Sequence, residues 1–482
     1  MRYQRRSRAG FTLVEMMVAT ALVLVIMLII SQAFASASKT FNTMRTAGFM
    51  QEKLRGGVNI LRKDLGNDHY GPPYGSALNG PHVSDQRLDR VGWAPPRSGY
   101  FSLRHLSPSI IEPVNNPFPL PPTDGEKLTS TRADSHVMQF TVRLPDGPAT
   151  ELFTAQFPGL FTSDPRVNAF VNSQGLLYTR WAEVLYYLDP MSDPGSTVDP
   201  VTGLPKQANT QTDGNGLPRY NLRRRIRLLA PTNVDFPPIP TATALNIILT
   251  CQQQFPDVIS PYIIGPGQQP NTAILRMPGP EALNLPDLDY TPVFAGTSQV
   301  PQYLFRLADD LNRRGLPLQH PTGDDLLMTD VLSFEIKAAW FNNPTFNRPP
   351  SQNGNGSLGT SPPSNIMANV ALNNPYFGGN MDEPFDDLPM AKLTPPQPNP
   401  NAPGTGPRLF DTGTLRVLIP LSPPLPPKLY DPNDWDDRSQ FLQSNGFSTV
   451  PTRINVRALQ IKLRVWDPRA EQARQATIVV EV

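Results

Sequence analysis

The feature that most constrains this chain is an apolar segment of 25 residues, Phe11 to Ala35, with a single charged side chain, Glu15. As an α-helix rising about 1.5 Å per residue, such a segment can cross the ~30 Å hydrocarbon core of a membrane. The ten preceding residues, MRYQRRSRAG, carry four arginines and no acid. Because basic residues beside an apolar span stay on the cytoplasmic side, the sequence predicts a single-pass protein with a cytoplasmic N-terminus.

Glu15 is the residue that an ordinary targeting segment leaves unexplained. A carboxylate inside hydrocarbon costs several kcal/mol unless it is neutralised or paired, so Glu15 is a functional-site hypothesis. Three other interpretations of the segment stay open: a simple signal anchor, a buried helix of a soluble domain, and a secretory signal peptide. For a signal peptide, Ala33-Phe34-Ala35 and Ala35-Ser36-Ala37 are both acceptable cleavage patterns.

The segment Gly10-Phe11-Thr12-Leu13-Val14-Glu15 resembles the prepilin cleavage and methylation motif, in which a basic leader ends in Gly and Glu is fifth in the mature chain. The resemblance implies a type IV prepilin-like protein. A prepilin peptidase would cut between Gly10 and Phe11 and methylate the new amine of Phe11. Glu15 would pair with the N-terminal ammonium of a neighbouring subunit. Since only one axial register brings these two charges together, the pair would specify assembly.

The helix is expected to continue beyond the apolar segment, over residues 36–66. Four apolar residues recur there at spacings of 4, 3 and 4: Leu54, Val58, Leu61 and Leu65. Such a stripe on a helix with charged neighbours predicts a face that packs on a sheet. Gly56-Gly57 is a candidate bend, and Gly66 a candidate helix end. The sequence therefore predicts one amphipathic continuation of the membrane helix.

Seven short segments predict β-strands, from alternation or from enrichment in β-branched and aromatic residues. They are Val137–Leu144, Glu183–Leu188, Leu222–Leu229, Val331–Phe341, Leu415–Leu418, Ala458–Trp466 and Ala476–Val482. In Ala458–Trp466, apolar residues alternate with Gln460, Lys462 and Arg464, as expected of a strand with one solvated face. The last two segments predict a terminal hairpin. The predicted fold class is α+β, with the long N-terminal helix packed on an antiparallel β-sheet.

Proline is unusually frequent, at 57 of 482 residues. Because proline fixes φ and removes an N–H donor, it disfavours long helices and central strands. We therefore expect short strands joined by long surface loops, with long Pro-rich loop insertions at residues 70–130, 190–218, 255–300 and 342–410.

The order of the strand segments resembles the core of the J-type minor pseudopilins of type II secretion and of the W-type minor pilins. The resemblance covers Trp181–Leu188, Arg223–Leu229, Val331–Ile336 and Ala458–Val482. This chain is about twice as long as typical members. The Pro-rich stretches lie between the shared blocks.

This family implies four parts: a basic leader at 1–10, a transmembrane and assembly helix at 11–35, an amphipathic helix at 36–66, and a periplasmic β-rich domain at 67–482. It implies insertion in the bacterial inner membrane, followed by entry into a filament. The implied partners are prepilin peptidase and other pilin or pseudopilin subunits of a type IV pilus or a type II secretion pseudopilus.

No catalytic, cofactor or metal site is predicted. Lys plus Arg number 42 and Asp plus Glu 41, so charge gives no argument for a nucleic-acid partner. The histidines lack metal-ligand spacing: His69, His82, His105, His136 and His320. Acidic clusters at 382–387 and 431–437 could offer oxygen ligands to Ca²⁺, but neither fits an EF-hand, so we interpret both as solvated loops. We expect no enzyme activity.

Two further features have simple structural interpretations. Arg223, Arg225 and Arg227 alternate along a predicted strand, which predicts one exposed strand face rather than an anion site. Cys251 is the only cysteine, so an intrachain disulfide is excluded, and we interpret it as a small buried apolar residue. The alternative function is a membrane-anchored or secreted binding protein whose loops recognise an extracellular polymer or protein.

Overall fold

The structure of the protein is a computed structural model. It describes residues 12–72, 74, 80–88, 93, 95–105, 110–111, 131–147, 152–157, 165–167, 169–191, 218–255, 257–259, 261–266, 271–283, 324–341, 408–413, 418–419, 428–429, 454–468 and 472–482. The two acidic clusters, His320, Gly10 and Phe11 lie outside these residues.

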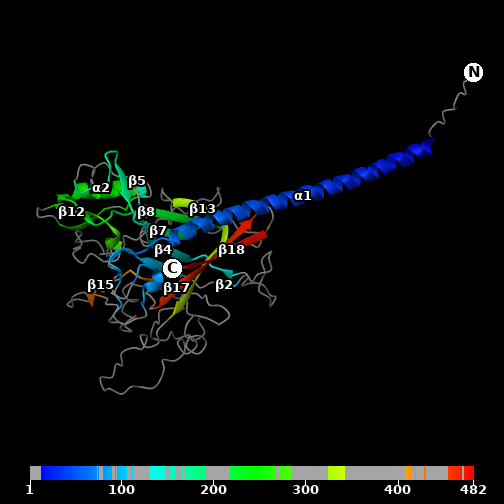
Figure 1. The fold of residues 1–482 in the computed structure, drawn as a ribbon. Coiled ribbons are helices and arrows are strands. Elements are labelled where there is room, and N and C mark those ends of the chain that lie inside the picture. The colour runs from blue at the N-terminus through cyan, green and yellow to red at the C-terminus, as the bar shows by residue number, and fades with distance from the viewer. Residues whose placement is uncertain are drawn as a thin grey trace, which may run out of the picture.

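The helix α1 runs without interruption over Leu13–Leu65, which is 53 residues. It begins after the N-cap Thr12, and it ends where the Gly66 N–H donates to the Arg62 carbonyl at 2.9 Å. Figure 1 shows its N-terminal half projecting far beyond the strands. The predicted end at Gly66 is confirmed. Gly56 and Gly57 lie inside the continuous helix and do not end it.

The described strands are β1 (Phe101–His105), β2 (Ile110–Ile111), β3 (Thr131–Arg132), β4 (His136–Arg143), β5 (Phe153–Gln156), β6 (Leu176–Thr179), β7 (Trp181–Pro190), β8 (Tyr220–Leu228), β9 (Val234–Asp235), β10 (Ile239–Pro240), β11 (Tyr262–Pro266), β12 (Thr272–Met277), β13 (Asp324–Phe341), β14 (Arg408–Asp411), β15 (Leu418–Ile419), β16 (Lys428–Leu429), β17 (Asn455–Asp467) and β18 (Gln472–Glu481). The remaining helices are α2 (Thr241–Gln254) and the 3₁₀ turns η1 (Val83–Asp85) and η5 (Pro280–Leu283).

The main sheet has eight strands in the order β14-β1-β4-β7-β8-β13-β17-β18, and every neighbouring pair is antiparallel. The α+β fold class is thus confirmed. Six predicted strands correspond to β4, β7, β8, β13, β17 and β18, and the last two form the predicted hairpin. Of the predicted strand at 415–418, only Leu418 is among the described residues, and it begins β15.

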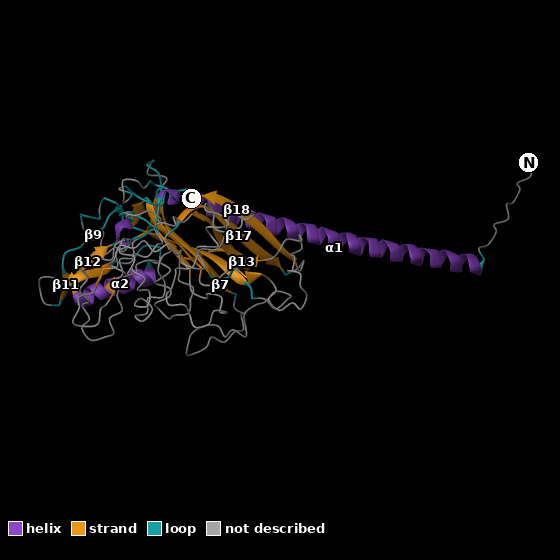
Figure 2. Ribbon diagram, turned by 90° about the horizontal axis from the view of Figure 1, so that it is seen from below, coloured by secondary structure: helices purple, strands orange, loops and turns teal. Residues whose placement is uncertain are grey.

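The second half of α1 packs on one face of this sheet, as Figures 1 and 2 show. Leu54, Leu61 and Leu65 are buried in one core cluster with the alternate apolar residues of β17. Those residues are Leu459, Ile461, Leu463 and Val465, at most 1% exposed. The predicted helical stripe and the strand alternation therefore form the two sides of the same core.

On the opposite face of the sheet several charged side chains are buried, which corrects the predicted exposed face of Arg223, Arg225 and Arg227. The predicted solvated face of β17 is only partly present, since Gln460 and Lys462 are partly exposed. Arg464 in β17 is buried, and so are Arg223, Arg225 and Arg227 in β8. Ion pairs accompany this burial, because a charge removed from water must find an opposite charge. Arg223 Nε lies 2.7 Å from Asp189, and two nitrogens of Arg227 contact Glu183 at 2.6 and 3.0 Å. The sequence showed that these arginines alternate along the strand, but it did not show that they are buried.

A smaller unit is inserted between β8 and β13. It contains α2 and a four-stranded sheet of β9–β12, and it shares a second apolar core with β5–β7 and neighbouring segments. In both Figure 1 and Figure 2 this unit lies at the end of the domain away from the projecting half of α1. Cys251 is buried in α2, as predicted, and burial raises the pKa of its thiol to about 12.

The prediction of loops throughout the Pro-rich stretches is wrong at several places. β1 and β2 lie in 70–130, β11 and β12 in 255–300, and β14 reaches into 342–410. The reason is that prolines flank these strands and do not interrupt most of them. The strand β12, for example, contains no proline and lies between Pro270 and Pro278. Proline here separates short strands instead of preventing them.

Candidate functional site

The candidate functional site is α1, which has an exposed apolar half and a docked half. Residues Leu13–Phe41 form a stretch of 29 residues that is long and apolar enough to cross a membrane, and the described part of the chain buries none of it. Large apolar side chains are exposed on all sides of this stretch, with Leu13 and Phe34 each 76% exposed. A surface of this kind is unstable in water, so it requires lipid or the helices of other proteins.

A capping box closes the N-terminal end of α1. The Glu15 backbone N–H donates to Thr12 Oγ1 at 3.3 Å, and Glu15 Oε2 accepts from the Thr12 N–H at 2.9 Å and from the Thr12 hydroxyl at 3.1 Å. These contacts satisfy amide groups that the first turn of a helix leaves free. The sequence motif therefore has a second, local use that sequence reasoning did not identify: Thr12 and Glu15 begin the helix.

The capping box leaves the Glu15 carboxylate available to a cation. Both of its described hydrogen bonds use Oε2, and Glu15 is exposed. A carboxylate at the start of an apolar span, with neutral partners only, still carries a full charge into a region of low dielectric. The arrangement can therefore accept an ammonium or guanidinium group from another chain. Gly10 and Phe11 lie outside the described residues, so the cleavage site stays a prediction.

The docked half of α1 begins at Met50, which is buried, whereas Phe49 is 58% exposed. At Gly57 the helix comes so close to β13 that an added Cβ would lie 2.7 Å from Met328 Cε. Nothing lies within 4 Å of the same position at Gly56. The glycine pair therefore permits a close approach at Gly57, whereas the space beside Gly56 is open.

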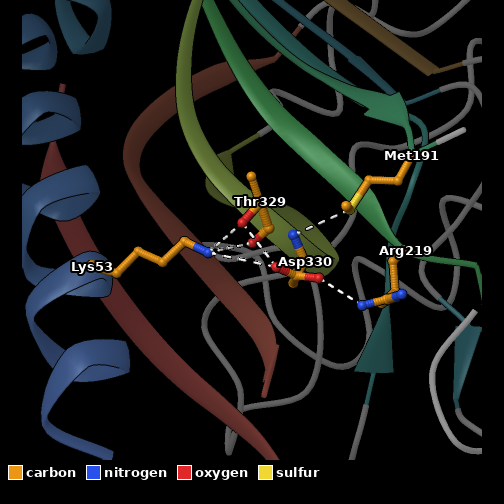
Figure 3. A network of polar contacts seen from close by, with 5 residues as sticks. All are labelled: Lys53, Met191, Arg219, Thr329 and Asp330. Atoms are coloured by element: carbon orange, nitrogen blue, oxygen red, sulfur yellow. Dashed lines mark hydrogen bonds and ion pairs between the residues drawn. The ribbon is translucent and has the colours of Figure 1, made fainter. Parts of the chain in front are cut away.

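A polar network joins the first turn of the docked half of α1 to the sheet, as Figure 3 shows. Lys53 Nζ donates to the Thr329 carbonyl at 2.8 Å and to Thr329 Oγ1 at 2.7 Å, and it lies 3.9 Å from Asp330 Oδ2. Asp330 also pairs with Arg219 at 2.7 Å, and its N–H contacts the Met191 sulfur. Lys53 therefore makes two hydrogen bonds to Thr329 and one longer ion pair with Asp330. The network therefore attaches α1 to β13 and to the ends of β7 and β8.

The backbone at Asp330 explains why β13 can present this network. Asp330 has a φ of 59°, in the left-handed region that aspartate tolerates better than most residues. The pairing of β13 with β8 shifts register between Met328 and Val331, as in a β-bulge. Burial lowers the pKa of Lys53, and the nearby Asp330 and Asp467 oppose that effect. Lys53 is thus a partly buried cation with its charge compensated.

A second network fastens the end of α1. Asp64 is buried, and it accepts two hydrogen bonds from Arg224, at 2.7 and 2.9 Å, and one from the Tyr186 hydroxyl at 2.5 Å. Burial beside Asp64 raises the pKa of Tyr186, so this hydroxyl remains a donor. Hydrogen bonding to Asp64 raises the pKa of Arg224, although burial opposes it. The last turn of α1 is therefore bound to β7 and β8.

The remaining residues considered for a site are not brought together. No group of three or more His, Cys, Asp or Glu with metal-ligand geometry occurs among the described residues. His105 and His136 stack at 3.8 Å as a cross-strand pair, and His136 accepts the Ile336 N–H. His69 packs against Phe101 and Phe140, whose rings stack on each other. Sequence reasoning missed the roles of Lys53 and Asp64, because nothing in the local pattern distinguishes them from solvent-facing helix residues. It identified Gly57 as part of a candidate bend but not as a contact with Met328.

Comparison with known families gives one match. Residues 5–31 match the family model described as the prokaryotic N-terminal methylation motif. This match includes three of the four N-terminal arginines, the candidate cleavage site and the first part of the exposed apolar half of α1. Neither the curated proteins nor the solved structures contain a match to the chain.

Proposed function

We propose, from the premise that this chain is a type IV prepilin-like protein, that it is a minor pilin or pseudopilin, a structural and assembly subunit of a type IV pilus or a type II secretion pseudopilus. The observation that carries the proposal is the methylation motif at residues 5–31 joined to an apolar helix with none of its 29-residue stretch buried. Proteins with this motif are structural subunits, and the role proposed here is correspondingly non-enzymatic.

The proposed processing follows from the motif. Prepilin peptidase cuts between Gly10 and Phe11 at the cytoplasmic face and methylates the amine of Phe11. Residues 1–10 are the leader, 11–35 the transmembrane and assembly helix, 36–66 its amphipathic continuation, and 67–482 the periplasmic domain. The mature protein spans the inner membrane once and then enters the filament, where its partners are other pilin-like subunits.

In the proposed assembly step, Glu15 pairs with the methylated N-terminal ammonium of a neighbouring subunit. The exposed carboxylate at the first turn of α1 supports this role, since its described partners are neutral groups of Thr12. The neighbour's ammonium would replace or share the Thr12 contacts. The J-type minor pseudopilins and the W-type minor pilins are the proposed classes, and their support is that the strand blocks that suggested them form adjacent strands β7, β8, β13, β17 and β18 of the sheet.

The decisive experiment is the mass of the N-terminal peptide of the mature protein. We expect N-methyl-Phe11. A terminus near Ser36 or Ser38 would instead support signal peptidase and a secreted binding protein, which is the alternative function.

A second experiment tests Glu15. The variant Glu15→Val should be processed and inserted normally but should enter filaments poorly. Its matched control is Glu52→Val, because Glu52 is an exposed glutamate on the same helix outside the apolar stretch. Equal filament entry by the two variants would remove the role proposed for Glu15.

A further inference from the structure

The strand β18 forms one edge of the main sheet and is long and regular. It has 10 residues and pairs with β17 from Asp467↔Gln472 to Ala458↔Glu481 without a register shift. The strand at the other edge, β14, has four residues. Within the described part of the chain, no strand pairs with the outer side of β18.

The direction of the backbone groups along β18 follows from one hydrogen bond. The Val482 N–H donates to the Arg457 carbonyl at 3.3 Å, so this pair is bonded across the hairpin. Residues of an antiparallel pair alternate between bonding to the partner strand and facing away from it. Gln475, Thr477 and Val479 therefore direct their N–H and C=O groups outward. The side chains of Thr477 and Val479 are exposed, Val479 by 53%.

Between Arg474 and Glu481, the charged residues near its two ends, this edge lacks the devices that normally prevent strand addition. Natural edge strands are protected by charged residues, proline, bulges or short length. The segment from Gln475 to Val480 contains no charged residue and no proline, and its pairing with β17 contains no bulge. Among the described residues, η1 lies at the C-terminal end of this edge, where the Ser84 N–H donates to the Val482 carbonyl at 2.8 Å.

The side chains beside the edge indicate which kind of strand fits there. On the face of β18 toward α1, Ile478 is fully buried, and Ala476 and Val480 pack partly buried against the same core. On the other face, Val479 lies opposite Gln460, and Thr477 opposite Lys462. An added strand would therefore need apolar residues at every second position, facing α1, and polar or small residues between them.

We propose that the outer edge of β18 binds a β-strand of a neighbouring pilin-like subunit and so extends the main sheet by one strand. The inference rests on the proposed function, because filament assembly brings the partner to this edge. Since α1 belongs to the same core cluster as Ile478, a subunit held by the exposed half of α1 arrives on the side of the domain where β18 lies. Backbone hydrogen bonds would supply affinity, and the alternate side chains specificity.

The position Val479 allows a sharp test, since its N–H faces away from β17. Val479→Pro removes no hydrogen bond within the sheet but blocks strand addition, and Val479→Lys places a charge on the edge. Val479→Thr is the matched control, because it keeps the backbone donor and a β-branched side chain. The full-length protein, expressed in its own cells, would carry a photoreactive amino acid at position 477. Crosslinked peptides would be sequenced by mass spectrometry, and urea unfolding of each variant would verify its fold.

We expect a crosslink to a strand segment of another protein that carries a prepilin methylation motif. Its yield should fall about tenfold or more in Val479→Pro and Val479→Lys, a change of about 1.4 kcal/mol in binding free energy, and should stay unchanged in Val479→Thr. Since the two blocking variants act by different means, misfolding of one leaves the other informative. A crosslink to a second copy of this chain, to lipid alone, or with a yield insensitive to both blocking variants would overturn the proposal.

The mature N-terminus and the amount of protein in filaments, measured in the same samples, separate the two proposals. Wild-type protein with N-methyl-Phe11 that enters filaments, but gives no edge crosslink to a pilin-like subunit, refutes strand addition alone. Protein that lacks N-methyl-Phe11 and is absent from filaments refutes the proposed function. If protein of this second kind also gives a crosslink at position 477 to a protein without the motif, the proposed partner of β18 is refuted too.

Discussion

Replacement of Asp64 by asparagine should destabilise the protein by about 2 to 3 kcal/mol, because it leaves Arg224 without its counter-charge. The side chains of Asp64 and Arg224 are only 7% and 14% exposed. Removing one partner of a buried ion pair costs about 3 to 5 kcal/mol. Two effects reduce this figure here. Arg224 also contacts Asp325 at 3.4 Å, and a negative charge in the last turn of a helix opposes the helix dipole by up to about 1 kcal/mol.

The assay is urea unfolding of the full-length protein in detergent micelles, followed by tryptophan fluorescence. With a slope of about 3 kcal/mol per molar urea, the midpoint should fall by somewhat less than 1 M at unchanged slope. The control is Asp68→Asn, since Asp68 also pairs with an arginine, Arg143 at 3.5 Å, but is 38% exposed. The control should lose no more than about 1 kcal/mol, as surface pairs do.

A double-mutant cycle isolates the pair itself. Asp64→Leu combined with Arg224→Leu should cost less than the sum of the single changes, and the difference should exceed the ~0.5 kcal/mol scatter of independent sites. Additive effects, or a loss below about 1 kcal/mol for Asp64→Asn, would show that the end of α1 is held by apolar packing alone.

Three further outcomes are expected from the same unfolding assay or from thiol labelling. Burial lowers the pKa of His69 to about 4, so as the pH falls the unfolded chain binds a proton at this side chain before the folded protein does. The free energy of unfolding should therefore fall by roughly 3 kcal/mol between about pH 6.5 and pH 4 and then level off. His69→Asn, which keeps a donor for the Thr141 carbonyl that His69 Nδ1 contacts at 2.8 Å, should flatten that pH dependence, and an unchanged profile would refute the assignment. Gly57→Val should cost more than Gly56→Val, by about 1 kcal/mol, because the end of the flexible but buried Met328 side chain must move, and equal costs would mean that the close approach is absent. Cys251, with its pKa raised to about 12, should resist iodoacetamide at pH 8 until urea is added, and rapid labelling of the native protein would contradict its burial.

Some of the fold could be predicted because it depends on local chemistry. A long apolar run needs lipid or protein whatever follows it, and a stripe at helical spacing predicts a packed face, so α1 was predicted with its end at Gly66. Alternation along Leu459–Val465 predicted a strand for the same reason. The short strands β11 and β12 were missed, since a high proline content argued against strands where prolines in fact only flank them. The helix α2 was missed as well, because it carries neither charged residues nor a capping side chain.

The sequence by itself predicted the apolar helix, the candidate cleavage site between Gly10 and Phe11, and the proposed role of Glu15, because each depends on residues within a few positions of one another. Only the tertiary structure decided how α1 is attached. Lys53 meets Thr329 across 276 positions, and Asp64 meets Arg224 across 160. It also decided that Arg223, Arg225 and Arg227 are buried and that β18 is an edge. Whether a residue is buried or paired depends on which distant segments pack against it. A local sequence pattern does not contain that information.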